Sequence, residues 1–144
     1  MVFPLESENL VECVHLFLGV FNQEPWNEKW AKSSVIRRFE DCQRTPGFYG
    51  LCWQEDSRIE AFAFGYFEQW DESQHFYLKE MCVATQKQRC GIGTKLLDVL
   101  TEKLRENGVT KLFLHTARDS IAQDFYLRCG FYISPKMIMM AKHL

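Results

Sequence analysis

Apolar residues in the first third of the chain recur at helical spacing in two segments. Residues 7–19 carry apolar side chains three or four positions apart, which predicts a helix. A second helix is predicted to begin at Asn27, a residue type favoured at helix N-termini, and to end before Thr45-Pro46-Gly47. The chain is therefore expected to open with a pair of helices.

After these helices, the apolar residues follow a pattern typical of β-strands. Residues 48–53 and 59–67 read as strands joined by a polar turn, and residues 76–84 form a third. The segment IEAFAFGYF at 59–67 is apolar on both faces, which is typical of an interior strand.

The last third alternates helix and strand. Residues 91–107 form the clearest helix, followed by a strand at 111–116, a helix at 119–129 and a strand-like run at 131–142 that would bury Met137–Met140. The order predicts a mixed α/β fold, with helices on both faces of one sheet, in a single domain over residues 1–144.

Composition excludes several classes of protein. The chain has 144 residues, of which 47% are hydrophobic, and its net charge is −2, which disfavours a nucleic-acid binder. No apolar run approaches the about 18–20 residues of a membrane span, so no membrane partner is expected. The aromatic fraction, 15%, is the unusual value.

The six cysteines and four histidines show no metal-ligand spacing, so we expect no metal site. No signal-peptide pattern opens the sequence, which favours a cytoplasmic location with reduced thiols over three disulfides.

One segment, residues 77–97, combines a strand, a glycine-bearing loop and a helix. Because the first-turn amides of a helix are unpaired and its dipole attracts anions, this loop is a candidate phosphate cradle. Leu96 replaces the third glycine of a dinucleotide fingerprint, and Gly93-Thr94-Lys95 has the wrong order for a Walker loop. Alone, the glycines could equally form a tight turn. The candidate cradle comprises Gln88, Arg89, Cys90, Gly91, Ile92, Gly93 and Thr94.

A second motif follows at residues 122–131, AQDFYLRCGF, with the pattern Ala-x-x-Phe-Tyr-x-x-x-Gly-Phe. Together with Gln88-x-x-Gly91-x-Gly93, it makes residues 58–134 resemble the GNAT superfamily of acyl-coenzyme-A-dependent N-acetyltransferases. Asp119 departs from the family pattern, which often has Asn there.

The resemblance implies a mostly antiparallel, twisted sheet that splays at its central strands. It implies acetyl-CoA as cosubstrate, with its pyrophosphate on the 88–93 loop and its pantetheine arm along Met81, Cys82 and Val83. It also implies that Tyr126 protonates the departing thiolate.

Glu80 is the candidate general base, because an attacking amine must lose a proton near neutral pH. Strand alternation predicts that Glu80 shares a face with Phe76, Leu78 and Cys82, where burial would raise its pKa. The alternative is a structural ion pair with an Arg or Lys.

The acceptor would be a primary amine of a small molecule or peptide, attacking directly in a ternary complex. Four tryptophans could line a pocket for a cationic amine, or could simply fill the space between helices and sheet: Trp26, Trp30, Trp53 and Trp70. The alternative function is a non-catalytic acyl-CoA sensor or interaction domain with the same fold. Either a monomer or a homodimer fits the sequence.

Overall fold

The computed structural model describes residues 1–144, which divide into two compact units, residues 1–114 and 115–144. The first unit contains a five-stranded sheet in the order β1-β2-β3-β4-β5. All neighbours are antiparallel except β4 and β5. The strands are β1 (Val2–Pro4), β2 (Phe48–Glu55), β3 (Arg58–Gln69), β4 (Gln74–Val83) and β5 (Val109–Phe113).

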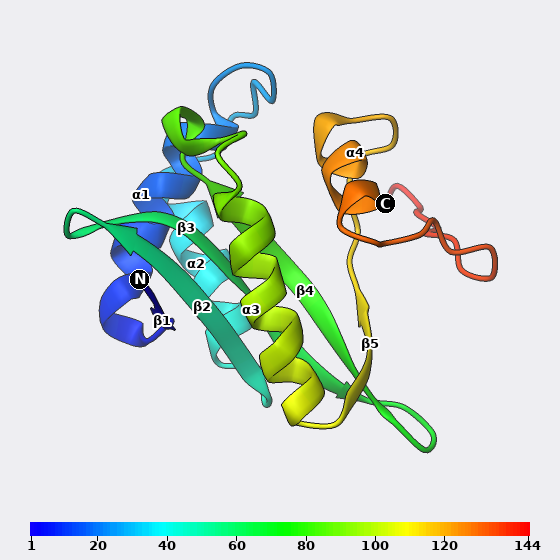
Figure 1. Cartoon of the computed structure of the whole chain (residues 1–144). Helices are drawn as coiled ribbons and strands as arrows, with labels where there is room; N and C mark the ends of the chain where they lie inside the picture. The colour runs from blue at the N-terminus through cyan, green and yellow to red at the C-terminus, as the bar shows by residue number, and fades with distance from the viewer. The chain divides into compact units, whose positions relative to one another are not determined.

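Helices cover both faces of this sheet, as Figure 1 shows. A 3-10 turn, η1 (Ser7–Asn9), leads into α1 (Leu10–Phe21), and α1 lies with α2 (Lys32–Gln43) on one face. The other face carries α3 (Ile92–Glu106), which follows the short η2 (Thr85–Lys87) and provides the crossover between the parallel strands. The predicted fold class is confirmed.

Aromatic side chains fill the layer between the sheet and the α1/α2 pair. The Phe39 ring lies 4.9 Å from that of Phe64 and 5.6 Å from that of Phe62, centroid to centroid. All three are fully buried. Burying a side chain of this size stabilises the fold by about 1.5–3 kcal/mol, so much of the aromatic excess is core.

The second helix begins later than predicted. Asn27 has a φ of +49° and lies in a loop, and α2 starts at Lys32 with Ala31 as its N-cap. The Asn22 side chain both accepts from the Trp30 N–H and donates to the Trp30 carbonyl, each at 2.9 Å. These bonds hold residues 22–31 as a loop, because they replace the backbone pairing that a helix would supply.

A β-bulge interrupts the pairing of β3 with β4. Glu80 pairs with Phe64, but Gly65 pairs with Leu78, so Lys79 is an extra residue on β4. A Cβ at Gly65 would lie 1.7 Å from the Tyr77 carbonyl oxygen, so glycine is required for this close approach.

The bulge corrects the predicted strand faces. Glu80 and Cys82 oppose Phe64 and Phe62 on the α1/α2 face. Beyond the extra residue the alternation is inverted, and Leu78, like Phe76, lies on the α3 face, so neither shares a face with Glu80.

The second unit contains one helix, α4 (Ile121–Arg128), whose N-cap Ser120 accepts a hydrogen bond from the Gln123 N–H at 3.1 Å. The predicted strand at 131–142 is absent. The Ser134 hydroxyl accepts from the N–H groups of Lys136 and Met137, which bends the chain around Pro135. Met137–Met140 are exposed rather than core.

No helix has the length and hydrophobicity that a bilayer span requires.

Candidate active site

The loop before α3 presents consecutive unpaired backbone amides. Gly91, the N-cap of α3, has a φ of +80° and no side chain caps the helix. None of the N–H groups of residues 89–94 donates to another group of the chain, whereas Lys95 N–H is bonded to the Gly91 carbonyl. Unpaired amides at the positive end of a helix dipole are an arrangement that can hold an anion.

The loop is tied to the end of β4 by a side chain. The Gln88 amide donates to the Val83 carbonyl oxygen at 3.0 Å. The Cys90 thiol donates to the Gln88 carbonyl at 3.6 Å, and Cys90 and Thr94 are exposed. Ile92 and Gly93 are buried, which anchors the first turn of α3 on the sheet.

One edge of β4 is open where it approaches this loop. Strand β5 pairs with β4 only as far as Tyr77. The Ala84 N–H donates to the Glu60 carbonyl of β3, so alternation directs the N–H groups of Val83 and Met81 to the opposite, open edge. This splay was expected from the sequence.

Cys82 lies differently from its two neighbours. Its side chain is 3% exposed and belongs to the core cluster on the α1/α2 face. Burial raises the pKa of its thiol far above the usual range, so the group is a neutral core side chain.

Glu80 is a nearly buried carboxylate, 12% exposed, on the α1/α2 face. The Arg38 Nε of α2 donates to Glu80 Oε1 at 2.6 Å. Burial raises the pKa of Glu80, whereas Arg38 and the charge of Lys79 lower it and Glu28 raises it. Both sequence-based alternatives are therefore combined in one group: a carboxyl with a raised pKa, held by an arginine.

Trp30 lies beside this ion pair. The Arg38 guanidinium carbon is 5.7 Å from the centroid of the Trp30 ring, and Trp30 Nε1 donates to the Glu28 carboxylate. Trp26 packs on Phe21 at 5.3 Å and belongs to the same core layer.

The structure does not bring the other two tryptophans to Glu80. Trp53 pairs with Ala61 on β3, which places it on the opposite sheet face from Phe62 and Glu80. Trp70 lies beyond the end of β3, stacked on His75 at 4.8 Å. The four tryptophans therefore do not form one wall.

Tyr126 belongs to the second unit. It lies in α4, and its carbonyl accepts the N–H groups of Cys129 and Phe131, which closes the turn at Gly130. Its ring lies 5.3 Å from that of Phe131. The Phe-Tyr and Gly-Phe pairs of the sequence motif thus meet in one small cluster.

A profile of the acetyltransferase (GNAT) family matches residues 13–131. The chain belongs to the GNAT acetyltransferase family.

One sequence relative is similar over part of the chain, and several solved structures share its fold. GCN5-related N-acetyltransferase 7, chloroplastic, of Arabidopsis thaliana is 36% identical over 56 residues, which is 38% of this chain and 20% of the plant protein. A possible acetyltransferase from Clostridium difficile 630 superposes with a TM-score of 0.84 at 10% identity, over 100% of this chain and 97% of the other.

Two aminoglycoside acetyltransferases share the GNAT fold as well. One, from an uncultured soil metagenomic sample and in complex with trehalose, has a TM-score of 0.76 at 21% identity and covers 100% of this chain and 95% of its own. The other, AAC(6')-Iy in complex with CoA, has a TM-score of 0.77 at 14% identity, with the same coverage of 100% and 95%.

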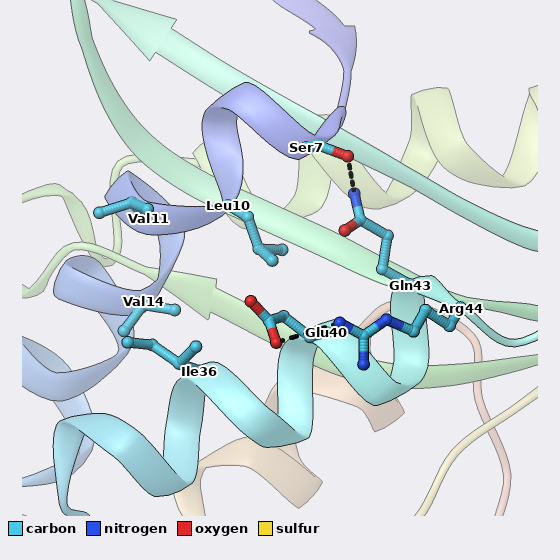
Figure 2. A pocket seen from close by; sticks show the side chains of 8 residues that line it. All are labelled: Ser7, Leu10, Val11, Val14, Ile36, Glu40, Gln43 and Arg44. Carbon is cyan, nitrogen blue, oxygen red and sulfur yellow. Dashed lines mark hydrogen bonds and ion pairs between the residues drawn. The ribbon is translucent and has the colours of Figure 1, made fainter.

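Two cavities lie in the first unit of this GNAT chain. The first, about 520 Å³, lies between α1 and α2 and contains none of the candidate residues. Figure 2 shows its apolar wall from Leu10, Val11, Val14 and Ile36, with Ser7 bonded to Gln43 at one end. The second, about 490 Å³, lies beside the Arg38–Glu80 pair and is lined by Ser34, Arg37, Arg38, Asp41, Cys42, Thr45, Tyr66 and Lys79.

Sequence reasoning missed Arg38 and Lys79. Arg38 belongs to no motif, and regular alternation would set Lys79 on the face away from Glu80. Gly65 was the available signal, since an isolated glycine inside an apolar strand indicates a bulge.

No group of three His, Cys, Asp or Glu side chains is placed to hold a metal ion.

Proposed function

We propose that the chain, as one domain over residues 1–144, transfers an acetyl group from acetyl-CoA to a primary amine by direct attack in a ternary complex. One observation carries the proposal. Within residues 80–94, a buried carboxylate, two strand amides at an open edge and six unpaired loop amides follow one another.

The residues present fit coenzyme A. The N–H groups of residues 89–94 would hold the pyrophosphate, and the open edge at Met81 and Val83 would pair with the pantetheine arm and the acetyl carbonyl. A backbone N–H aimed at that carbonyl stabilises the oxyanion that develops during attack. The CoA complex of AAC(6')-Iy, a neighbour of the same fold, supports this assignment.

Glu80 is the proposed general base. An alkyl amine with a pKa near about 10 is mostly protonated at neutral pH, and a carboxylate with a raised pKa accepts that proton more readily. The amine nitrogen then forms a bond to the acetyl carbon while the C–S bond breaks. The thiolate takes its proton from the Tyr126 hydroxyl, which we propose as the acid.

The test is thiol release from acetyl-CoA across a panel of amines. Release that depends on an amine and yields one acetylated amine per thiol supports the proposal. If CoA binds in the calorimeter while no amine raises thiol release above background, the chain is an acyl-CoA sensor instead.

The proposed acid is tested separately. We expect Tyr126→Phe to lower kcat at least tenfold and to leave the Kd for CoA unchanged, because only the proton-donating hydroxyl is removed and the ring is kept. A change confined to Kd would assign Tyr126 a packing role.

All six cysteines are free thiols, and four of them are buried. Free thiols are typical of reducing compartments, which supports our proposal of a cytoplasmic location.

A further inference from the structure

The cavity beside Glu80 is basic. Its lining contains three cationic side chains, Arg37, Arg38 and Lys79, and one carboxylate, Asp41. Strand β4 supplies Lys79, and α2 supplies the other three. The cavity holds about 490 Å³, enough for a small organic acceptor.

The three cations are not neutralised to the same extent. Glu80 neutralises Arg38 at 2.6 Å. Asp41 lies 3.8 Å from Arg37, but both side chains are well exposed, so solvent screens that pair. Lys79 is half-buried and has no carboxylate within 4.0 Å, and its ammonium lies only over the Tyr77 ring, at 5.6 Å. Among the lining side chains, three cations therefore face one carboxylate, and Lys79 has no ion-pair partner, while Glu28 and Glu68 act only at longer range, on Glu80 and Tyr66.

Two other side chains of the cavity lining, Cys42 and Tyr66, have raised pKa values. Burial raises the pKa of the Cys42 thiol to about 11, while Lys79 and Arg38 act in the opposite direction. Burial also raises the pKa of Tyr66, so its phenol is neutral and able to donate. Hydroxyl donors thus stand beside the ammonium and guanidinium groups.

The bulge sets Lys79 next to the proposed base. Lys79 and Glu80 are consecutive, so their Cα atoms are about 3.8 Å apart. In a regular strand they would face opposite sides of the sheet, but the extra residue in β4 lets Lys79 line the same cavity as Arg38. Glu80, the proposed base for the amine, is therefore adjacent to Lys79, a cation that can bind an anionic group.

We propose that the acetyl acceptor is an amine that also carries an anionic group, a carboxylate or a phosphate, which binds in this cavity against Lys79 and Arg37. The inference rests on the proposed acetyl transfer. Such an acceptor places its amine at Glu80 and its anion at Lys79. A polycationic acceptor would have to bring positive charge to a basic cavity.

The experiment compares matched acceptors that differ in one charge. Amino acids are assayed against their amides, and aminoalkyl phosphates against the corresponding amino alcohols, with polyamines and aminoglycosides beside them. Because the amide also has a less basic amine, the quantity compared is the pH-independent kcat/KM. We expect the anionic member of at least one pair to exceed its neutral partner tenfold or more, and the better pair identifies carboxylate or phosphate.

Variants then assign the preference to the cavity. Lys79→Met is expected to raise the KM of the anionic acceptor about tenfold, to leave the KM of acetyl-CoA unchanged and to abolish the preference for the anionic member. Lys79→Arg, which keeps the charge, is expected to restore most of that preference. Lys103→Met, on an exposed lysine of α3, is the matched control and should change neither value. Thermal unfolding of each variant verifies that it is folded.

The outcomes separate the two proposals. If amines are acetylated but neutral or polycationic acceptors are preferred, or if Lys79→Met leaves the preference intact, this inference is wrong and acetyl transfer stands. If no amine is acetylated, the proposed function fails and this inference fails with it.

Discussion

The loop before α3 exposes main-chain groups, whereas the cavity beside Glu80 is lined by charged side chains. The loop offers main-chain N–H groups at residues 89–94 and depends on a residue that accepts a φ of +80° at Gly91. The cavity offers side-chain charges from α2 and β4 that are set by one bulge. Phosphate groups are common to every reaction of a CoA enzyme, so a backbone site suits them. An acceptor differs from enzyme to enzyme, and side chains are free to vary with it.

The largest effect is expected from Glu80→Gln, which removes the proposed base and keeps the shape. We expect kcat to fall by about 10²–10⁴-fold and the Kd of CoA to stay the same, because the loop amides are untouched. The acidic limb of the wild-type pH–rate profile should lie above the usual glutamate range, since burial raises the pKa of Glu80, and it should vanish in the variant.

Glu102→Gln on exposed α3 is the matched control and should behave as wild type. An acidic limb that persists unchanged in Glu80→Gln would assign the titration to another group and leave Glu80 a structural partner of Arg38.

The second prediction concerns Gly65→Ala, a substitution that disturbs the cavity and changes no charged residue. In Gly65→Ala the new Cβ would meet the Tyr77 carbonyl oxygen at 1.7 Å, so the bulge must shift. We expect the free energy of unfolding to fall by about 3 kcal/mol, and turnover to fall beyond what the loss of folded protein explains. Urea denaturation followed by tryptophan fluorescence measures the first effect.

Gly19→Ala in α1 is the control, because a Cβ there meets nothing within 4 Å and alanine favours a helix by about 0.5–1 kcal/mol. Equal losses at both positions would show that the bulge has no special requirement for glycine.

This bulge also explains how far the sequence could be read. Periodicity identified α1, α3, α4 and strands β2 to β5, since each of these follows from the spacing of apolar side chains, but it did not identify the three-residue β1. The conformation of the loop before α3 was predictable because glycines and a helix start dictate backbone geometry locally. The faces of β4 were not, because one extra residue at Lys79 inverts the alternation that the prediction assumed.

Two other errors had local causes. Asn27 suits a helix N-cap in isolation, but the Asn22 side chain binds the backbone of Trp30 and keeps the loop open for several residues more. Met137–Met140 form a continuous apolar run, as a buried strand would, yet Ser134 and Pro135 turn the chain and these residues are exposed. In both cases the two hydrogen bonds of one side chain competed with a pattern, and patterns do not report such bonds.

The third prediction tests the backbone site with two glycines that have the same φ. Gly91→Ala and Gly108→Ala both place alanine at +80° with no atom within 4 Å of the new Cβ. Each should lower stability by about 1–2 kcal/mol through backbone strain alone. Only Gly91→Ala should weaken CoA binding, by about tenfold in Kd from calorimetry, because Gly91 begins α3 and Gly108 follows its end. Equal Kd values for the two variants would remove the loop from the binding site.

The smallest effect is expected from Arg38, which bonds to the proposed base Glu80 and also lines the proposed acceptor cavity. Arg38→Met removes the hydrogen bond and the charge that lower the pKa of Glu80, so its pKa should move further above the usual value and the acidic limb should shift to higher pH. Turnover on the plateau should change little, since Glu80 is ionised there in both proteins.

The pH dependence of the free energy of unfolding tests the same variant independently. Below the unfolded-state pKa of glutamate the carboxyl is neutral in both states, so the loss of Arg38 costs little. Above the folded pKa the buried carboxylate lacks its partner, and the cost is about 1 kcal/mol, because Arg38 is itself 37% exposed. The stability difference from wild type should therefore widen as pH rises from about 4 to 8 in urea denaturation. Arg105→Met, at an exposed pair on α3, should show no such trend. A stability difference that does not vary with pH would mean that Arg38 contributes packing against Trp30 and not charge. The proposed preference for an anionic acceptor would then depend on the charges of Lys79 and Arg37 alone.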